Sequence, residues 1–165
     1  KVIIIGSDPY PQLGVADGIA FSCGNTLEMQ PTLKHMLNAV NRTVYDGVGQ
    51  SHNSDLTRWS NQGVLMLNTA LTTTVSKMGQ HFAIWKPFLA YLFDYLTFGH
   101  TGLVYIYMGK QAQEWKDVVH DMNYKFILDH PISAEYNKDS KWNCEDIFVK
   151  VQKILKDNNN YSLIW

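Results

Sequence analysis

Apolar residues are concentrated in four short runs along the chain, at residues 2–5, 64–67, 103–107 and 126–128. The runs are rich in β-branched, leucine and aromatic side chains and contain no charged position. Continuous apolar strands of this length are typical of parallel sheets that are covered on both faces. The runs therefore predict four buried, parallel strands.

The stretches between these runs carry apolar residues at three- and four-residue spacing, which is the period of an amphipathic helix. This spacing predicts helices at four places: residues 33–40, 88–96, 115–119 and about 143–156. Pro31 stands where the first of these helices would begin. Pro87 is expected in the first turn of the second helix, because proline is tolerated there.

The alternation of strands and helices predicts an α/β fold, a three-layer α/β/α sandwich around a central, mostly parallel four-stranded sheet. The length suits one domain, so we expect residues 1–165 to form a single domain. In such sheets ligands bind outside the carboxyl ends of the strands. The residues that follow the four predicted strands are Asp8, Asn68, Gly109 and His130. A carboxylate, a carboxamide, a glycine turn and an imidazole at one edge indicate an active site.

Composition narrows the class of protein further. Hydrophobic residues make up 45% and charged residues 18% of the chain, which excludes a disordered protein. The apolar runs are far shorter than the roughly 20 residues of a membrane-spanning helix. Two cysteines, Cys23 and Cys144, are too few for a disulfide framework or a four-thiolate metal site, and favour an intracellular location, in the nucleus or cytoplasm of a host cell. The net charge of −1 requires a nucleic-acid partner to meet a local basic patch.

The segment after the first predicted strand carries the most specific motif of the chain. Residues 6–22 read GSDPYPQLGVADGIAFS, and ten positions agree, in order and without a gap, with GQDPYHGPGQAHGLAFS. The segment therefore resembles the water-activating motif of uracil-DNA glycosylases. Taken alone, Asp8 before Pro9 would be a turn residue that accepts hydrogen bonds from backbone amides.

Three further motifs resemble the same family. Residues 63–72 read GVLMLNTALT against GVLLLNTVLT, residues 108–113 read MGKQAQ against WGxxAQ, and His130 with Pro131 opens the segment that reads HPSPLS in the family. The motifs occur in family order, each at the end of a predicted strand, and together they cover nearly the whole chain. Family members usually carry a helical segment ahead of the first strand, so we expect this sequence to lack one.

The resemblance implies an enzyme that hydrolyses the N-glycosidic bond of deoxyuridine in DNA, releasing uracil and leaving an abasic site. Such enzymes extrude the target nucleotide into a pocket. By resemblance Asp8 and His130 are catalytic: the aspartate orients the attacking water and stabilises the positively charged sugar, and a neutral histidine donates to O2 of the leaving uracil. No metal or other cofactor is expected, and the other histidines, at positions 35, 52, 81, 100 and 120, show no metal-ligand spacing.

The resemblance also implies a base pocket made of Ser7, Tyr10, Phe21 and Asn68. Phe21 would stack on the uracil ring, and Asn68 would read the edge that carries O4 and N3. Tyr10 would stand against C5 and exclude the methyl group of thymine. Ser7 replaces the usual glutamine of the family and would contribute through its backbone.

The residues placed against DNA by the resemblance are Pro11, Ser22, Gly109, Ile132 and Ser133. Pro11 replaces the usual histidine, and the resulting DPYP resembles the poxviral branch of the family, whose domain is also a polymerase processivity partner. The family's leucine wedge aligns with Ile132 after a two-residue deletion, or with the small Ala134 without one. Ile132 is therefore either a wedge between bases or a loop residue packed on the core. The two serines either bind phosphates or hydrogen-bond locally to the backbone.

The expected partner is uracil-containing DNA, single- or double-stranded, together with a replication or inhibitor protein. We expect no membrane partner and a monomer, and a viral origin fits. The main alternative is a DNA- or protein-binding module on the same fold with weak or no catalysis, which the altered wedge segment and the near-neutral charge favour. A small-ligand α/β enzyme is a second alternative, but the chain lacks the glycine-rich phosphate motifs and the nucleophile elbow of such enzymes.

Overall fold

The computed structural model describes residues 1–26, 28–48 and 53–165. The four strands in these residues form one sheet: β1 (Val2–Gly6), β2 (Val64–Asn68), β3 (Val104–Met108) and β4 (Tyr124–Leu128). Their order is β2-β1-β3-β4, and each neighbouring pair is parallel. The predicted α/β fold with a central parallel sheet is confirmed.

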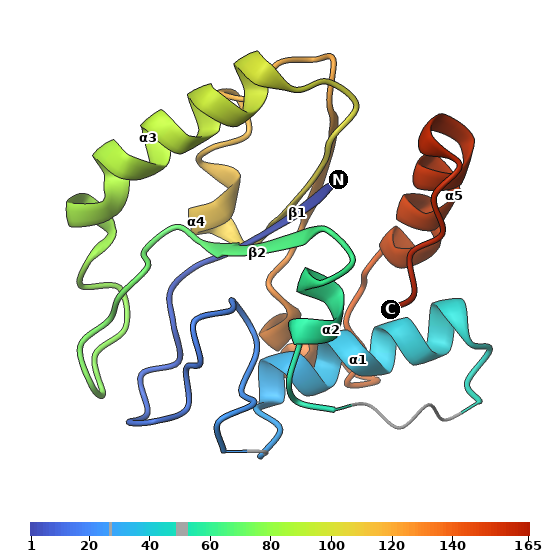
Figure 1. Ribbon diagram of the computed structural model, residues 1–165. Helices are drawn as coiled ribbons and strands as arrows, with labels where there is room; N and C mark the ends of the chain where they lie inside the picture. The colour runs from blue at the N-terminus through green and yellow to red at the C-terminus, as the bar shows by residue number, and fades with distance from the viewer. Residues whose placement is uncertain (27, 49–52) are drawn as a thin grey trace.

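Helices cover both faces of the sheet: α1 (Pro31–Val44), α2 (Thr57–Ser60), α3 (Phe82–Gly99), α4 (Lys110–Gln113), the 3-10 helix η1 (Pro131–Tyr136) and α5 (Ile147–Asn159). Figure 1 shows α3 and α4 on one side of the sheet and α1, α2 and α5 on the other. Within the described ranges, no helix combines the length and the apolar character needed to cross a bilayer.

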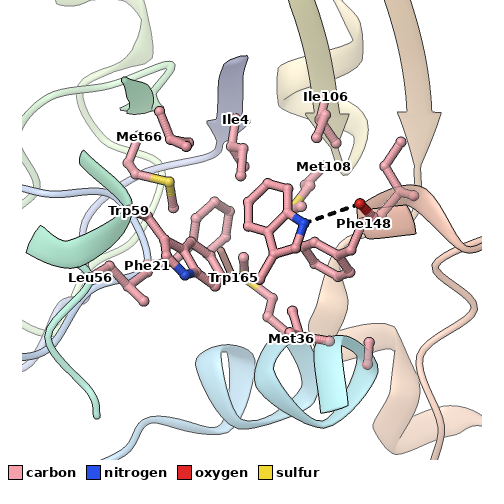
Figure 2. Packing of buried hydrophobic residues seen from close by; sticks show 14 of the residues in the cluster. Ile4, Phe21, Met36, Leu56, Trp59, Met66, Ile106, Met108, Phe148 and Trp165 are labelled. Carbon is pink, nitrogen blue, oxygen red and sulfur yellow. Dashed lines mark hydrogen bonds between the residues drawn. The ribbon is translucent and has the colours of Figure 1, made fainter. Parts of the chain in front are cut away.

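The strands divide their side chains between two cores. Along β1, Val2 and Ile4 face α1 and α5, whereas Ile3 and Ile5 face α3 and α4, because successive side chains of a strand point to opposite faces. The first core is built around aromatic rings, among them Trp165, whose indole N–H donates to the carbonyl of Phe148 (Figure 2). The central strands are therefore buried on both sides, as their continuous apolar character predicts.

Three helix predictions are wrong in their bounds. Pro87 lies at the sixth position of α3 and not in the first turn, because the helix already begins at Phe82. Its missing N–H leaves the carbonyl of Ala83 without a helical partner, and the exposure of Pro87 lets water take that place.

The predicted helix at residues 115–119 is a series of turns that follow the short α4. Trp115 and Val119 are buried all the same, so turns that pack against the sheet produced the four-residue spacing. The last helix begins at Ile147 and not near residue 143, because Asp146 adopts a left-handed backbone conformation with φ of 56°.

Candidate active site

A cavity of about 620 Å³ opens at the carboxyl ends of β1 and β2. The loop after β1 forms one wall, and the end of β2 with the residues that follow it forms another. Five residues with predicted roles in chemistry or base recognition line this one cavity: Asp8, Tyr10, Phe21, Asn68 and His130. The chain thus brings together side chains that are up to 122 positions apart.

The end of β1 allows the base-recognition residues to lie close to the sheet. At Gly6, an added Cβ atom would lie 2.6 Å from Oδ1 of Asn68 and 2.7 Å from the ring of Phe21. Phe21 adopts a left-handed backbone conformation with φ of 67°, and the Tyr10 hydroxyl donates to its carbonyl at 2.9 Å. A non-glycine residue in this conformation is strained and is held by its surroundings. The loop therefore fixes the Phe21 ring above the strand end.

Tyr10 and Asn68 differ in what their polar atoms can offer to a ligand. Burial raises the pKa of Tyr10 above the usual range of a phenol, so its hydroxyl stays neutral and serves the loop. Among the residues that the structure describes, the Asn68 carboxamide has no hydrogen-bond partner, although the residue is buried. Because Asn68 lines the cavity, its carboxamide is available to a ligand with a matching donor and acceptor.

The Asp8 carboxylate is held by donors from two parts of the chain. The Ser7 hydroxyl donates to Oδ1 at 2.9 Å, and the Gly79 amide donates to Oδ2 at 2.8 Å. Ser7 therefore contacts Asp8 through its side chain, in addition to any role of its backbone. Two fixed donors define the orientation of the carboxylate within the cavity.

The position of His130 depends on the turn after β3. Gly109 has φ of 89°, and a Cβ atom built on it would lie 3.0 Å from Cβ of His130. Only glycine combines this conformation with such a close approach. Gly109 thus packs against the side chain of His130, and it does not line the cavity.

The environment of His130 favours its neutral form. Burial lowers the pKa of the imidazole, and the negative charge of Asp8 opposes this shift only in part. Nδ1 accepts a hydrogen bond from the Ile132 amide at 3.4 Å, so a neutral ring carries its proton on Nε2. His130 is therefore suited to donate a hydrogen bond from Nε2.

The residues predicted to contact DNA have more varied surroundings. Pro11 lines the cavity, and its carbonyl accepts a hydrogen bond from the Ser76 amide at 2.9 Å. Ser22 is buried, and its hydroxyl contacts Asp17 at 2.5 Å and accepts from the Leu56 amide at 3.1 Å. These bonds join the loop of Ser22 to the residues before α2, which differs from the local backbone bond stated as the alternative for Ser22.

The two residues that the alternative alignments place at the wedge position differ in burial. Ala134 is fully buried in the core on the α1 side, which excludes it as a side chain that enters a base stack. Ile132 is half-buried and does not pack against either core cluster in the described part of the chain. Ser133 is also half-buried, and its amide donates to the carbonyl of His130 at 2.8 Å.

Several residues that shape the cavity were not predicted from the sequence. Thr32, Leu71 and Thr72 line it, and Gly79 binds Asp8 through its backbone. Thr32 follows Pro31 at the start of α1, a position that indicated only a helix boundary. A backbone amide such as that of Gly79 leaves no side-chain signature. Outside the undescribed positions, which include His52, no cluster of three metal-ligating side chains is present.

Comparisons with known proteins show the family of this chain. The model of the Uracil DNA glycosylase superfamily matches residues 1–155. The chain belongs to the uracil-DNA glycosylase superfamily. It is 31% identical over 168 residues to the uracil-DNA glycosylase of Mycoplasmopsis pulmonis, covering the whole of this chain and 73% of that protein. The enzyme of Fusobacterium nucleatum is 32% identical, with 100% and 72% covered.

Solved structures of uracil-DNA glycosylases are similar as well. The crystal structure of mimivirus uracil-DNA glycosylase has a TM-score of 0.88 and 26% identity, and the match covers all of this chain and 67% of that one. A mimivirus variant in complex with UGI has a TM-score of 0.86. The predicted function, a DNA repair glycosylase that hydrolyses N-glycosyl bonds, is confirmed at the level of the family, and the alternative of a non-catalytic binding module is not favoured.

Proposed function

We propose that the cavity holds an extruded deoxyuridine and that Asp8 and His130 hydrolyse its N-glycosidic bond. The observation that carries this proposal is that the carboxylate and the imidazole line one cavity together with Phe21 and Asn68. Its volume of about 620 Å³ is in the range of small-molecule sites and suits one nucleoside. Cleavage develops positive charge on the sugar and negative charge on uracil, so an anion and a hydrogen-bond donor in one site stabilise both.

Each proposed role follows from an observed arrangement. Asp8, fixed by two donors, orients the attacking water and stabilises the cationic sugar. His130, neutral and protonated on Nε2, donates to O2 of the departing uracil. Phe21 stacks on the base, and the unpartnered Asn68 carboxamide binds the edge with O4 and N3. Tyr10, held by its bond to the Phe21 carbonyl, excludes a methyl group at C5.

Uracil release from a single-stranded oligonucleotide tests the two catalytic roles. Asp8→Asn and His130→Leu are each expected to lower kcat by at least a hundredfold, the usual range for a lost acid, base or charge-stabilising group. Asp94→Asn and His100→Leu, at exposed positions of α3 and its end, serve as matched controls and should keep the wild-type rate. Wild-type rates in either active-site variant would contradict the proposal.

The partner that we propose is uracil-containing DNA, with Ile132 as the side chain that enters the base stack. The half-buried position of Ile132, outside both cores, supports this role. Ile132→Ala should lower kcat/KM about tenfold on double-stranded substrate and by less than threefold on single-stranded substrate, because only a duplex must be unstacked. Ile164→Ala, at an exposed isoleucine that does not line the cavity, is the control. Equal losses on both substrates would exclude a wedge.

The face around the cavity is also the place where we expect a protein partner to bind. UGI, present in the mimivirus complex, is expected to bind the face around the cavity and to inhibit uracil release. A replication partner, as the resemblance of DPYP to the poxviral branch implies, and the monomeric state remain predictions. Sedimentation of the chain alone and in mixture with UGI measures both the monomer and the complex.

A further inference from the structure

One of the two donors to Asp8 is Gly79, which lies outside the four motifs that resemble the family. Gly79 belongs to segment 72–81, which leads from the residues after β2 to the start of α3. The segment lines the cavity through Thr72, Val75 and Met78. Since the Gly79 amide donates to Oδ2 of Asp8 at 2.8 Å, the position of this segment determines one side of the carboxylate.

Local hydrogen bonds shape the outer part of segment 72–81. The Thr73 hydroxyl donates to the carbonyl of Lys77 at 3.0 Å, and the Lys77 amide donates to the carbonyl of Thr74 at 2.9 Å. The Ser76 amide ties this turn to the loop of Asp8 through the carbonyl of Pro11. All of these bonds precede Gly79, so they do not fix the chain on its other side.

His81 fixes that other side by joining the two ends of the segment. Its Nδ1 lies 2.8 Å from Oγ1 of Thr72, and its Nε2 lies 3.3 Å from Oγ1 of Thr74. The indole N–H of Trp85 donates to the same Thr72 oxygen at 2.8 Å. Because an indole N–H can only donate, the Thr72 hydroxyl accepts from Trp85, and its second hydrogen bond joins it to Nδ1 of His81.

We propose that His81 is a positioning residue for the reaction: it closes segment 72–81, so that the Gly79 amide meets the Asp8 carboxylate. This inference rests on the catalytic role proposed for Asp8. The residues proposed to contact the base lie on other parts of the chain. Loss of His81 should therefore impair the chemical step and leave substrate binding nearly unchanged.

Steady-state kinetics on a single-stranded uracil oligonucleotide test the proposal. His81→Ala is expected to lower kcat about tenfold, because a misplaced catalytic group loses rate without losing binding, and to change KM by less than twofold. Thr72→Val removes the central hydroxyl at nearly constant shape and should cause a similar loss. The double variant should be no slower than the slower single variant, since both act through one hydrogen-bond chain. His100→Ala, at the opposite end of α3, is the matched control.

A structural readout separates positioning from a general loss of stability. The NMR signal of the Gly79 amide proton is expected to move in the same direction in Asp8→Ala and in His81→Ala, because the first variant removes the acceptor of the bond and the second displaces its donor. An unchanged Gly79 signal in His81→Ala, an unchanged kcat, or a tenfold rise of KM would each overturn the inference. A wild-type protein that releases no uracil would refute the proposed function instead, while the Gly79 signal would still decide the positioning role.

Discussion

At the scale of single residues, the candidate site combines groups whose protonation states are set by their surroundings. His130 is the clearest case, because burial and the Ile132 amide both favour a neutral ring with its proton on Nε2. Because His130 is neutral, no second charged group has to be removed from water beside Asp8. The site therefore keeps its negative charge on the carboxylate, where the cationic sugar would lie.

The lowered pKa of His130 predicts a pH dependence of stability. Its folded-state pKa lies below the ordinary value of 6.5, so the unfolded chain takes up the proton first as the pH falls. The contribution of His130 to stability is complete above pH 6.5, declines as the pH falls toward the folded-state pKa, and is constant below it. Urea unfolding between pH 7.5 and 4.5 should show that wild type loses more stability than His130→Leu. Parallel pH curves for both proteins would contradict this expectation.

The sequence predicted the side chains of the site better than its supporting contacts. Asp8, Asn68 and His130 could be predicted to lie together, because the carboxyl ends of parallel strands meet at one edge. The hydroxyl bond from Ser7 to Asp8 could not be predicted, because it depends on a rotamer of a residue that departs from the family motif. The bond from Gly79 depends on where a loop folds back, 71 residues further along the chain.

At the scale of elements, hydrogen bonds join the loop that follows β1 to the loop that follows β2. The Thr69 hydroxyl donates to the carbonyl of Ser7 at 2.9 Å, and the Ala70 amide donates to the same carbonyl at 3.0 Å. The loops after β1 and β2 are thus joined directly beneath the cavity. The strands were predicted more accurately than the helix at residues 115–119, because continuous apolar runs have few alternatives, whereas spacing of four residues also occurs in turns.

The close approach at the end of β1 predicts the effect of a single methyl group. In Gly6→Ala, the new Cβ atom would push apart the Asn68 carboxamide and the Phe21 ring, whose nearest atoms lie 2.6 and 2.7 Å from it. We expect a stability loss of about 1–3 kcal/mol and a fall of at least tenfold in kcat/KM for uracil release. Gly99→Ala, where a Cβ atom meets nothing within 4 Å, is the control. Wild-type kinetics in Gly6→Ala would show that Phe21 and Asn68 have room to move.

At the scale of the whole molecule, the last residues connect elements that are distant in sequence. The ring of Trp165 lies edge-on to Trp59 and Phe148, with centroid distances of 5.1 and 5.0 Å. Gln62 donates to the carbonyl of Ile164 and accepts from its amide, both at 2.8 Å. The tail thereby joins α2, α5 and the residues before β2, and Trp165 packs in the core that contains Trp59 and Phe148 (Figure 2).

Removal of the Trp165 ring should therefore weaken the fold and spare the chemistry. Trp165→Ala is expected to lower the free energy of unfolding by about 3–5 kcal/mol, as for other large aromatic side chains in a core. Below its melting temperature the variant should keep a kcat within twofold of wild type, because Trp165 does not line the cavity. Ile164→Ala, at the exposed neighbouring position, should cost less than 1 kcal/mol. Urea unfolding measured beside activity separates the two effects.

The order of strands in the sheet has a consequence for how the chain reaches its native state. β1 pairs with β2, 62 residues later, and with β3, 102 residues later, so this apolar strand remains without either partner during early synthesis. At a translation rate of about 5–20 residues per second, β3 follows β1 by roughly 5–20 s. Pairing between such distant segments is slow. Nascent chains that are stalled before β3 should thus depend on chaperones to avoid aggregation.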